Sequence, residues 1–151
     1  MFNYKIENIV YSIDKKTAQL SELFSYNIMN DIELKIPNYK EQIAETLYEY
    51  FTTWQSNIEA AHYKINSVQN SDKTQVLNPK DIHIIDKYIK KTLPFIKDIN
   101  HTLNIYNQLA VISVLLSIVD DYLRMPCFTL KLQAYSACLL WECSLSDMNS
   151  I

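Results

Sequence analysis

Apolar residues recur at intervals of three and four positions through most of this chain, the spacing that places side chains on one face of an α-helix. The spacing predicts a first long helix over about residues 4–30. Its apolar positions are Ile6, Ile9, Val10, Ile13, Leu20, Leu23, Phe24 and Ile28. Residues 31–37 alternate apolar and charged side chains instead. Alternation is typical of a strand, but a single strand has no partner, so we interpret this stretch as an extended connection that ends at Pro37.

A second long helix is predicted over about residues 38–68, where the apolar stripe is clearest. Asn38 is placed to cap this helix, and Glu41 follows three residues later as the reciprocal partner of a capping box. The stripe consists of Ile43, Leu47, Tyr50, Phe51, Trp54, Ile58, Ala61, Ile65 and Val68. The polar residues 69–75 that follow are predicted to form a loop.

The second half of the chain predicts three further helical segments. Asn78 and Pro79 supply a cap and a first residue for a helix that Pro94 should end or kink. A central helix then continues to about Leu123, and Pro126 separates it from a last helix over about 128–143. The apolar face of the last helix is predicted to contain Leu130, Ala134, Ala137, Cys138 and Trp141.

These elements predict an all-α fold. We expect one domain over residues 1–151, a helical bundle of about five helices, two of them long, with a frayed tail at 144–151. The chain of 151 residues is 48% apolar, which is enough for an ordinary core. With 21% charged residues and a net charge of −3, it is neither a disordered segment nor a basic protein suited to nucleic acid.

Other features of composition exclude whole classes of function. The chain contains no glycine, so P-loops, dinucleotide-binding fingerprints and GxSxG elbows are excluded. The longest apolar stretch, residues 109–119, is too short to span a membrane, and the N-terminus lacks the pattern of a secretory signal. Three cysteines without a CxxC spacing favour a reducing cytoplasm, of a bacterium or of a host cell if the protein is viral.

The coding bias of the chain concerns its origin. Arg124 is the only arginine among the fourteen lysine and arginine residues, and isoleucine and asparagine are abundant. Lysine, isoleucine and asparagine have A/T-rich codons, so we infer a low-GC genome, such as that of a low-GC bacterium, a mobile element or a virus.

Two Glu/Asp-x-x-His spacings resemble those of metal-binding bundles: Glu59 with His62, and Asp98 with His101. All four residues lie off or at the margin of the predicted apolar stripes, so we expect no metal site and no cofactor. Cys127 beside Pro126 is open to three interpretations: a reactive thiol, a cofactor attachment point, or a small buried apolar residue. We favour the last.

An acidic ridge is the most distinctive surface that the sequence predicts. Glu41, Glu45 and Glu49 follow one another at intervals of four, and Tyr48 lies beside them. In one interpretation the ridge is solvated, or it is neutralised by a lysine-rich helix over residues 80–97 that lies antiparallel to it. In the other, the ridge binds a basic protein. The candidate partner-binding residues are Glu41, Glu45, Tyr48 and Glu49.

The sequence thus favours a non-enzymatic helical protein-binding module, such as a small inhibitor, an immunity-type protein or an adaptor, whose partner is another protein, possibly a basic one. It predicts no binding to nucleic acid or membranes, and eleven tyrosines leave a homodimer open. One alternative is a sensor domain with an apolar pocket for a fatty acid, a haem or a bilin. Another is a small helical enzyme whose residues assemble through space.

Overall fold

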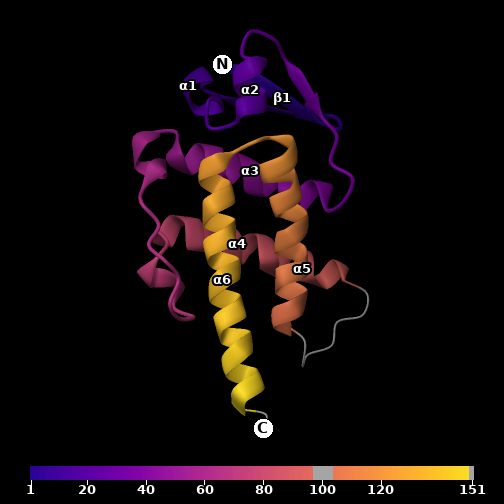
Figure 1. Cartoon of the computed structure of the whole chain (residues 1–151). Helices are drawn as coiled ribbons and strands as arrows, with labels where there is room; N and C mark the ends of the chain where they lie inside the picture. Colours follow the sequence, from indigo (N-terminus) through magenta and orange to yellow (C-terminus); the bar gives the residue numbers. More distant parts are fainter. Residues whose placement is uncertain (97–103, 150–151) are drawn as a thin grey trace.

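The chain folds into a small N-terminal sheet followed by two layers of helices that cross each other (Figure 1). The computed structural model describes residues 1–96 and 104–149, with side chains for 1–96 and 104–143. In chain order its elements are β1 (Phe2–Ile6), β2 (Ile9–Ile13), α1 (Lys15–Ala18), α2 (Glu22–Tyr26), β3 (Ile32–Leu34), α3 (Lys40–Trp54), η1 (Glu59–His62), η2 (Lys73–Gln75), α4 (Pro79–Thr92), η3 (Leu93–Phe95), α5 (Asn104–Leu116), η5 (Ser117–Tyr122, a π-helix) and α6 (Pro126–Asn149).

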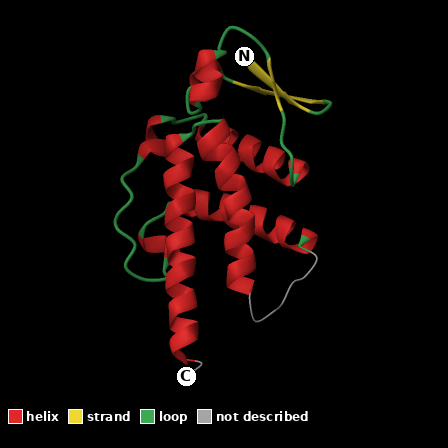
Figure 2. Ribbon diagram, turned by 45° about the vertical axis from the view of Figure 1, so that its right-hand side comes forward, coloured by secondary structure: helices red, strands yellow, loops and turns green. Residues whose placement is uncertain are grey.

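The predicted all-α fold is wrong, because the described residues include a three-stranded mixed sheet and the fold is mixed α/β. The strand order is β2-β1-β3 (yellow in Figure 2). β1 pairs antiparallel with β2 through a turn at residues 7–8, and Phe2 lies opposite Ile13. β1 pairs parallel with β3, and Tyr4 lies opposite Ile32. The stretch at 31–37 therefore has a strand partner after all.

The first predicted helix is replaced by two strands and two short helices. Phe2, Tyr4 and Ile6 alternate inward along β1, whereas Ile9 and Val10, which the helical stripe placed in the core, are exposed on β2. β-branched and aromatic residues favour strands, and their period of two fits this short segment as well as a period of 3.6 does.

α3 is half as long as the predicted second helix. Its first turn follows Tyr39, which has a positive φ of 53°, and within the described chain no side chain caps it, so the predicted capping box is wrong. The α-helix ends at Trp54, and the chain continues through η1 and an irregular stretch. Ile58, Ile65 and Val68 are consequently only half-buried.

The third predicted helix is confirmed in detail as α4. The Asn78 side chain accepts a hydrogen bond from the Lys80 amide at 2.9 Å, Pro79 is the first residue, and the helix ends at Thr92, before Pro94. α6 begins at Pro126 and continues to Asn149, beyond the predicted end at 143. Among the described residues, no helix is long and apolar enough for a membrane span.

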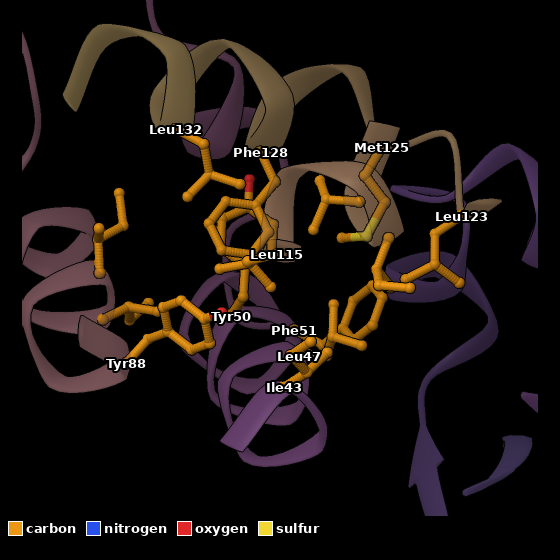
Figure 3. Packing of buried hydrophobic residues seen from close by; sticks show 14 of the residues in the cluster. Ile43, Leu47, Tyr50, Phe51, Tyr88, Leu115, Leu123, Met125, Phe128 and Leu132 are labelled. Atoms are coloured by element: carbon orange, nitrogen blue, oxygen red, sulfur yellow. The ribbon is translucent and has the colours of Figure 1, made fainter. Parts of the chain in front are cut away.

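The main core lies where the α5–α6 pair crosses the layer formed by α3 and α4 (Figures 1 and 3). Ile43, Leu47 and Phe51 of α3 are fully buried there. Tyr50 stacks on Phe128 of α6, with ring centroids 4.1 Å apart and ring planes 3° from parallel. One side of the α5–α6 pair is thus committed to the core, and its other side points away from α3 and α4.

Candidate functional site

The acidic ridge of α3 lies against the lysines of α4. Glu45 pairs with Lys91 and with Lys87, the latter at 3.6 Å, and Glu49 pairs with Lys87 at 3.3 Å and with His83 at 3.8 Å. The order of these pairs shows that the two helices run antiparallel. The hydrogen bond from Lys91 lowers the pKa of Glu45. Two of the three ridge glutamates are therefore neutralised within the fold.

The two other predicted residues, Tyr48 and Glu41, differ in their surroundings. Tyr48 is half-buried and packs on Tyr11 of β2, with ring centroids 5.4 Å apart. Glu41 is exposed in the first turn of α3 and makes no ion pair with residues 1–96 or 104–143. The geometry corresponds to the interpretation in which a lysine-rich helix neutralises the ridge, while docking of a basic partner there stays an untested prediction.

A buried ion pair that the sequence did not suggest joins α4 to α6. The Lys131 ammonium lies 3.1 Å from the Asp81 carboxylate, and their side chains are 1% and 0% exposed. Asp81 also accepts hydrogen bonds from Trp54 Nε1 at 3.0 Å and from the Tyr63 hydroxyl at 2.8 Å. Lys131 donates to the Tyr50 hydroxyl at 3.0 Å.

Three aromatic rings enclose the same ammonium. The Lys131 nitrogen lies 4.8 Å from the ring centroid of Tyr50, 4.6 Å from that of Trp54 and 4.9 Å from that of Tyr63, distances at which a cation is attracted to a ring face. Burial lowers the pKa of Lys131, and Asp81 opposes that shift. Because the fold itself already supplies partners to both charges, we interpret this cluster as a structural link between α3, α4 and α6.

Cys127 lies at the start of α6, one turn before Lys131. Its Sγ is 2.8 Å from Nδ1 of His62, the last residue of η1. Cys127 is half-buried, whereas Cys138 and Cys143 are buried. Burial raises the pKa of the Cys127 thiol, Lys131 lowers it and Asp81 raises it, with a net upward shift. The thiol is therefore protonated at neutral pH, and the neighbouring imidazole can accept its proton when it reacts.

The two Glu/Asp-x-x-His spacings noted in the sequence differ in how far the structure describes them. Within the described part of the chain, no group of three or more histidine, cysteine, aspartate or glutamate residues is arranged to hold an ion. Glu59 and His62 both lie on η1, and His62 faces Cys127. Asp98 and His101 lie outside the described residues.

α5 and α6 lie side by side across α3 and α4 (Figures 1 and 2). The surface that this pair turns away from α3 and α4, which we call the hairpin face, is formed by uncharged residues. Its exposed residues are Tyr106, Ala110, Ser113, Ser117, Leu130, Gln133, Leu140 and Trp141. Residues 104–119 and 125–141 contain one charged residue, the buried Lys131, among 33 positions, where the chain average of 21% would place about seven.

Large apolar side chains stand out on this face. Leu130, Leu140 and Trp141 of α6 are 56%, 53% and 44% exposed. The neighbouring row, Ala110 and Ser113 of α5 with Ser117 of η5, consists of small residues. Among the described residues of this pair, exposed charged side chains lie beyond the ends of the face, at Asp120, Asp121 and Arg124 and again at Glu142. Exposed large apolar side chains on a surface depleted in charge are typical of a protein interface.

No protein-family model, curated protein or solved structure matches this chain. Its function must therefore be argued from its own surfaces.

The sequence contained a signal for the hairpin face that the predicted stripe missed. Ala134 and Cys138 are buried as predicted, but Leu130 and Trp141, assigned to the same inward face, point outward. Apolar residues lie on more than one side of α6, and a helix with that pattern is expected to be buried on more than one side. Lys131 lies between the buried Phe128 and Leu132, but this position alone does not identify Asp81 as its partner.

Proposed function

We propose that this chain is a protein-binding module that docks its partner on the hairpin face. One observation carries this function: α6 exposes two leucines and a tryptophan, and the exposed residues of the hairpin face on α6 and the adjacent α5 include no charged side chain. Soluble monomers rarely leave large contiguous apolar patches uncovered, and charge depletion marks the centre of interfaces. Small inhibitor, immunity-type and adaptor proteins act through docking of this kind.

The chemistry of the hairpin face specifies the kind of partner. A charged group of the partner that lay against Leu130 or Leu140 would lose its hydration without gaining a counter-charge. Burying such a group is unfavourable by several kcal/mol. The partner should therefore present an apolar, uncharged surface rather than the basic surface expected for the acidic ridge. The face also has no exposed lysine or arginine, the residues with which interfacial helices bind anionic lipid.

Site-specific photo-crosslinking in cells of the source organism tests this function. A benzophenone amino acid replaces Leu140 on the hairpin face or, as the matched control, the exposed Lys90 on α4. We expect a covalent protein adduct of defined mass from position 140 and none above background from position 90. Adding Leu130→Glu to the position-140 chain should remove the adduct, because the new carboxylate would be buried without a partner.

Circular dichroism and thermal melting of each variant establish that the chain still folds. If positions 140 and 90 give equal yields, or if Leu130→Glu leaves the adduct unchanged in a folded chain, the hairpin face is not the docking surface.

A further inference from the structure

A thiol and an imidazole from distant parts of the chain meet between η1 and the start of α6. Sγ of Cys127 lies 2.8 Å from Nδ1 of His62 and 3.9 Å from Nε2, so Nδ1 is the nitrogen within hydrogen-bond distance. A base in contact with a thiol is the arrangement that activates cysteine as a nucleophile. We infer that Cys127 is a nucleophilic modification site that forms a mixed disulfide with small disulfides, while His62 accepts its proton.

The fold holds both members of this pair in place. His62 is the last residue of η1, and the hydroxyl of the next residue, Tyr63, donates a hydrogen bond to Asp81 of α4 at 2.8 Å. Cys127 is the second residue of α6, a helix that packs against the core. Because η1 and α6 are anchored separately, the two side chains are already in contact before a reagent arrives, as efficient proton transfer requires.

The electrostatic surroundings make a proton acceptor necessary at neutral pH. Burial raises the pKa of the Cys127 thiol, the ammonium of Lys131 lowers it and Asp81 raises it, with a net upward shift. Few Cys127 side chains are therefore thiolates at neutral pH, although the thiolate is the form that attacks. Transfer of the proton to His62 during the attack removes this obstacle, and the Lys131 ammonium attracts the negative charge that develops on sulfur.

The positions of the other cysteines determine the product. Cys138 and Cys143 are buried, whereas Cys127 is half-buried and open to small reagents. At about 1.5 Å per residue along α6, Cys138 and Cys143 lie about 16 Å and 24 Å from Cys127. A disulfide requires Cα atoms within about 7 Å of each other. Cys127 therefore cannot pair with either cysteine of its own chain, and its disulfide partner must be an external thiol group.

The exchange conserves atoms and electrons. Sγ of Cys127 attacks one sulfur of the small disulfide and its proton passes to Nδ1 of His62. The new S–S bond forms as the S–S bond of the reagent breaks. The departing sulfur keeps the electron pair of the broken bond and takes the proton from His62, which becomes neutral again. Cys127 is thus oxidised and half of the reagent is reduced to a thiol, so an excess of small thiol reverses the step.

Hydroxyethyl disulfide, a small uncharged reagent, tests the inference on the purified chain at neutral pH. Intact mass measures the rate of adduct formation, and peptide mapping locates the adduct. We expect one adduct, at Cys127, which is absent from Cys127→Ser and is removed by dithiothreitol. His62→Ala should react more slowly by about 10-fold or more, because it lacks the proton acceptor, and the control variant His83→Ala should react at the wild-type rate.

Chemical rescue separates proton transfer from a purely structural role of His62. Imidazole added to the buffer should accelerate the reaction of His62→Ala, because it can enter the vacated space and accept the thiol proton. It should leave the rate of the wild type unchanged. Circular dichroism establishes that each variant is folded.

Three results would overturn the inference. They are a His62→Ala chain that reacts as fast as the wild type, a slow His62→Ala chain that imidazole does not accelerate, and adducts that form at equal rates on all three cysteines. These measurements need no partner protein, so their outcome is independent of docking on the hairpin face.

Discussion

Replacing Lys131 with methionine removes the ammonium of the buried ion pair while keeping most of the side-chain volume. The Asp81 carboxylate would then remain buried with Trp54 and Tyr63 as hydrogen-bond donors but without a counter-charge. Removing one partner of a buried pair typically costs about 3–5 kcal/mol. Both side chains are almost completely buried, so solvent screening does not reduce this value.

The same substitution removes the hydrogen bond to the Tyr50 hydroxyl and the attraction between the ammonium and three rings. These contacts involve one group and are not additive with the ion pair, so we keep the total at about 4 kcal/mol. For a chain of this size, a loss of about 4 kcal/mol lowers the melting temperature by about 8–16 °C.

Urea denaturation followed by circular dichroism measures the free energy of unfolding of Lys131→Met. Lys90→Met on the exposed side of α4 is the matched control and should change it by less than about 0.5 kcal/mol. The double variant Asp81→Asn/Lys131→Met removes both charges and should be more stable than Lys131→Met alone. A Lys131→Met chain within about 1 kcal/mol of the wild type, or a double variant less stable than the single one, would contradict this role of the buried pair.

Three further predictions concern pH, backbone strain and thiol chemistry. Burial raises the folded-state pKa of several tyrosines above the ordinary value of 10.0. The stability that these tyrosines contribute is therefore complete below pH 10 and is lost as the pH rises above 10. The loss is up to about 1.4 kcal/mol per tyrosine and pH unit. These tyrosines are Tyr4, Tyr50, Tyr88 and Tyr135. Melting temperature measured between pH 9 and pH 12 should therefore fall steeply above about pH 10, and a flat profile would contradict it. Glu7→Gly should raise the free energy of unfolding, measured by urea denaturation, by about 1 kcal/mol, because Glu7 adopts a φ of 54° in the β1–β2 turn. An unchanged or lower stability would show that the exposed contact between Glu7 and Lys40 outweighs the strain. Iodoacetamide should alkylate Cys127 before the two buried cysteines, as peptide mass mapping would show. Cys127 should be alkylated more slowly in His62→Ala than in the control variant His83→Ala. Equal rates in these two variants would exclude His62 as the proton acceptor.

Local chemistry explains why α4 could be predicted from the sequence. Asn78, Pro79 and Pro94 act on the backbone next to them, so the beginning and end of this helix require no knowledge of the rest of the fold. The antiparallel position of its lysines beside Glu45 and Glu49 was one of two open interpretations, because the pitch of both helices places those charges on one side.

The sheet could not be predicted, for two physical reasons. The apolar spacing around Ile6, Ile9 and Val10 is compatible with a helix and with two short strands. The turn between the strands is formed by glutamate and asparagine at 7–8, without the glycine that usually marks a hairpin turn in a sequence. The strand at Ile32–Leu34 pairs with β1 across a large separation in sequence, so its partner is set by tertiary packing.

The buried cluster around Lys131 was beyond the sequence for a related reason. Its partners Tyr50, Trp54, Tyr63 and Asp81 come from three separate stretches, and only the folded chain brings them together. The hairpin face was closer to prediction, since the absence of charge over 104–119 and 125–141 is visible in the sequence. The sequence did not show which sides of α5 and α6 pack against the core.

The most direct measurement compares one charge on each of the two competing surfaces. The yield of protein adduct from the photo-crosslinker at position 140 is measured in chains that also carry Ser113→Lys on the hairpin face or Glu41→Lys on the acidic ridge. Docking on the hairpin face predicts that Ser113→Lys abolishes the adduct and that Glu41→Lys leaves it unchanged. Loss of the adduct with Glu41→Lys but not with Ser113→Lys would contradict docking on the hairpin face and would indicate that the partner binds the acidic ridge of α3.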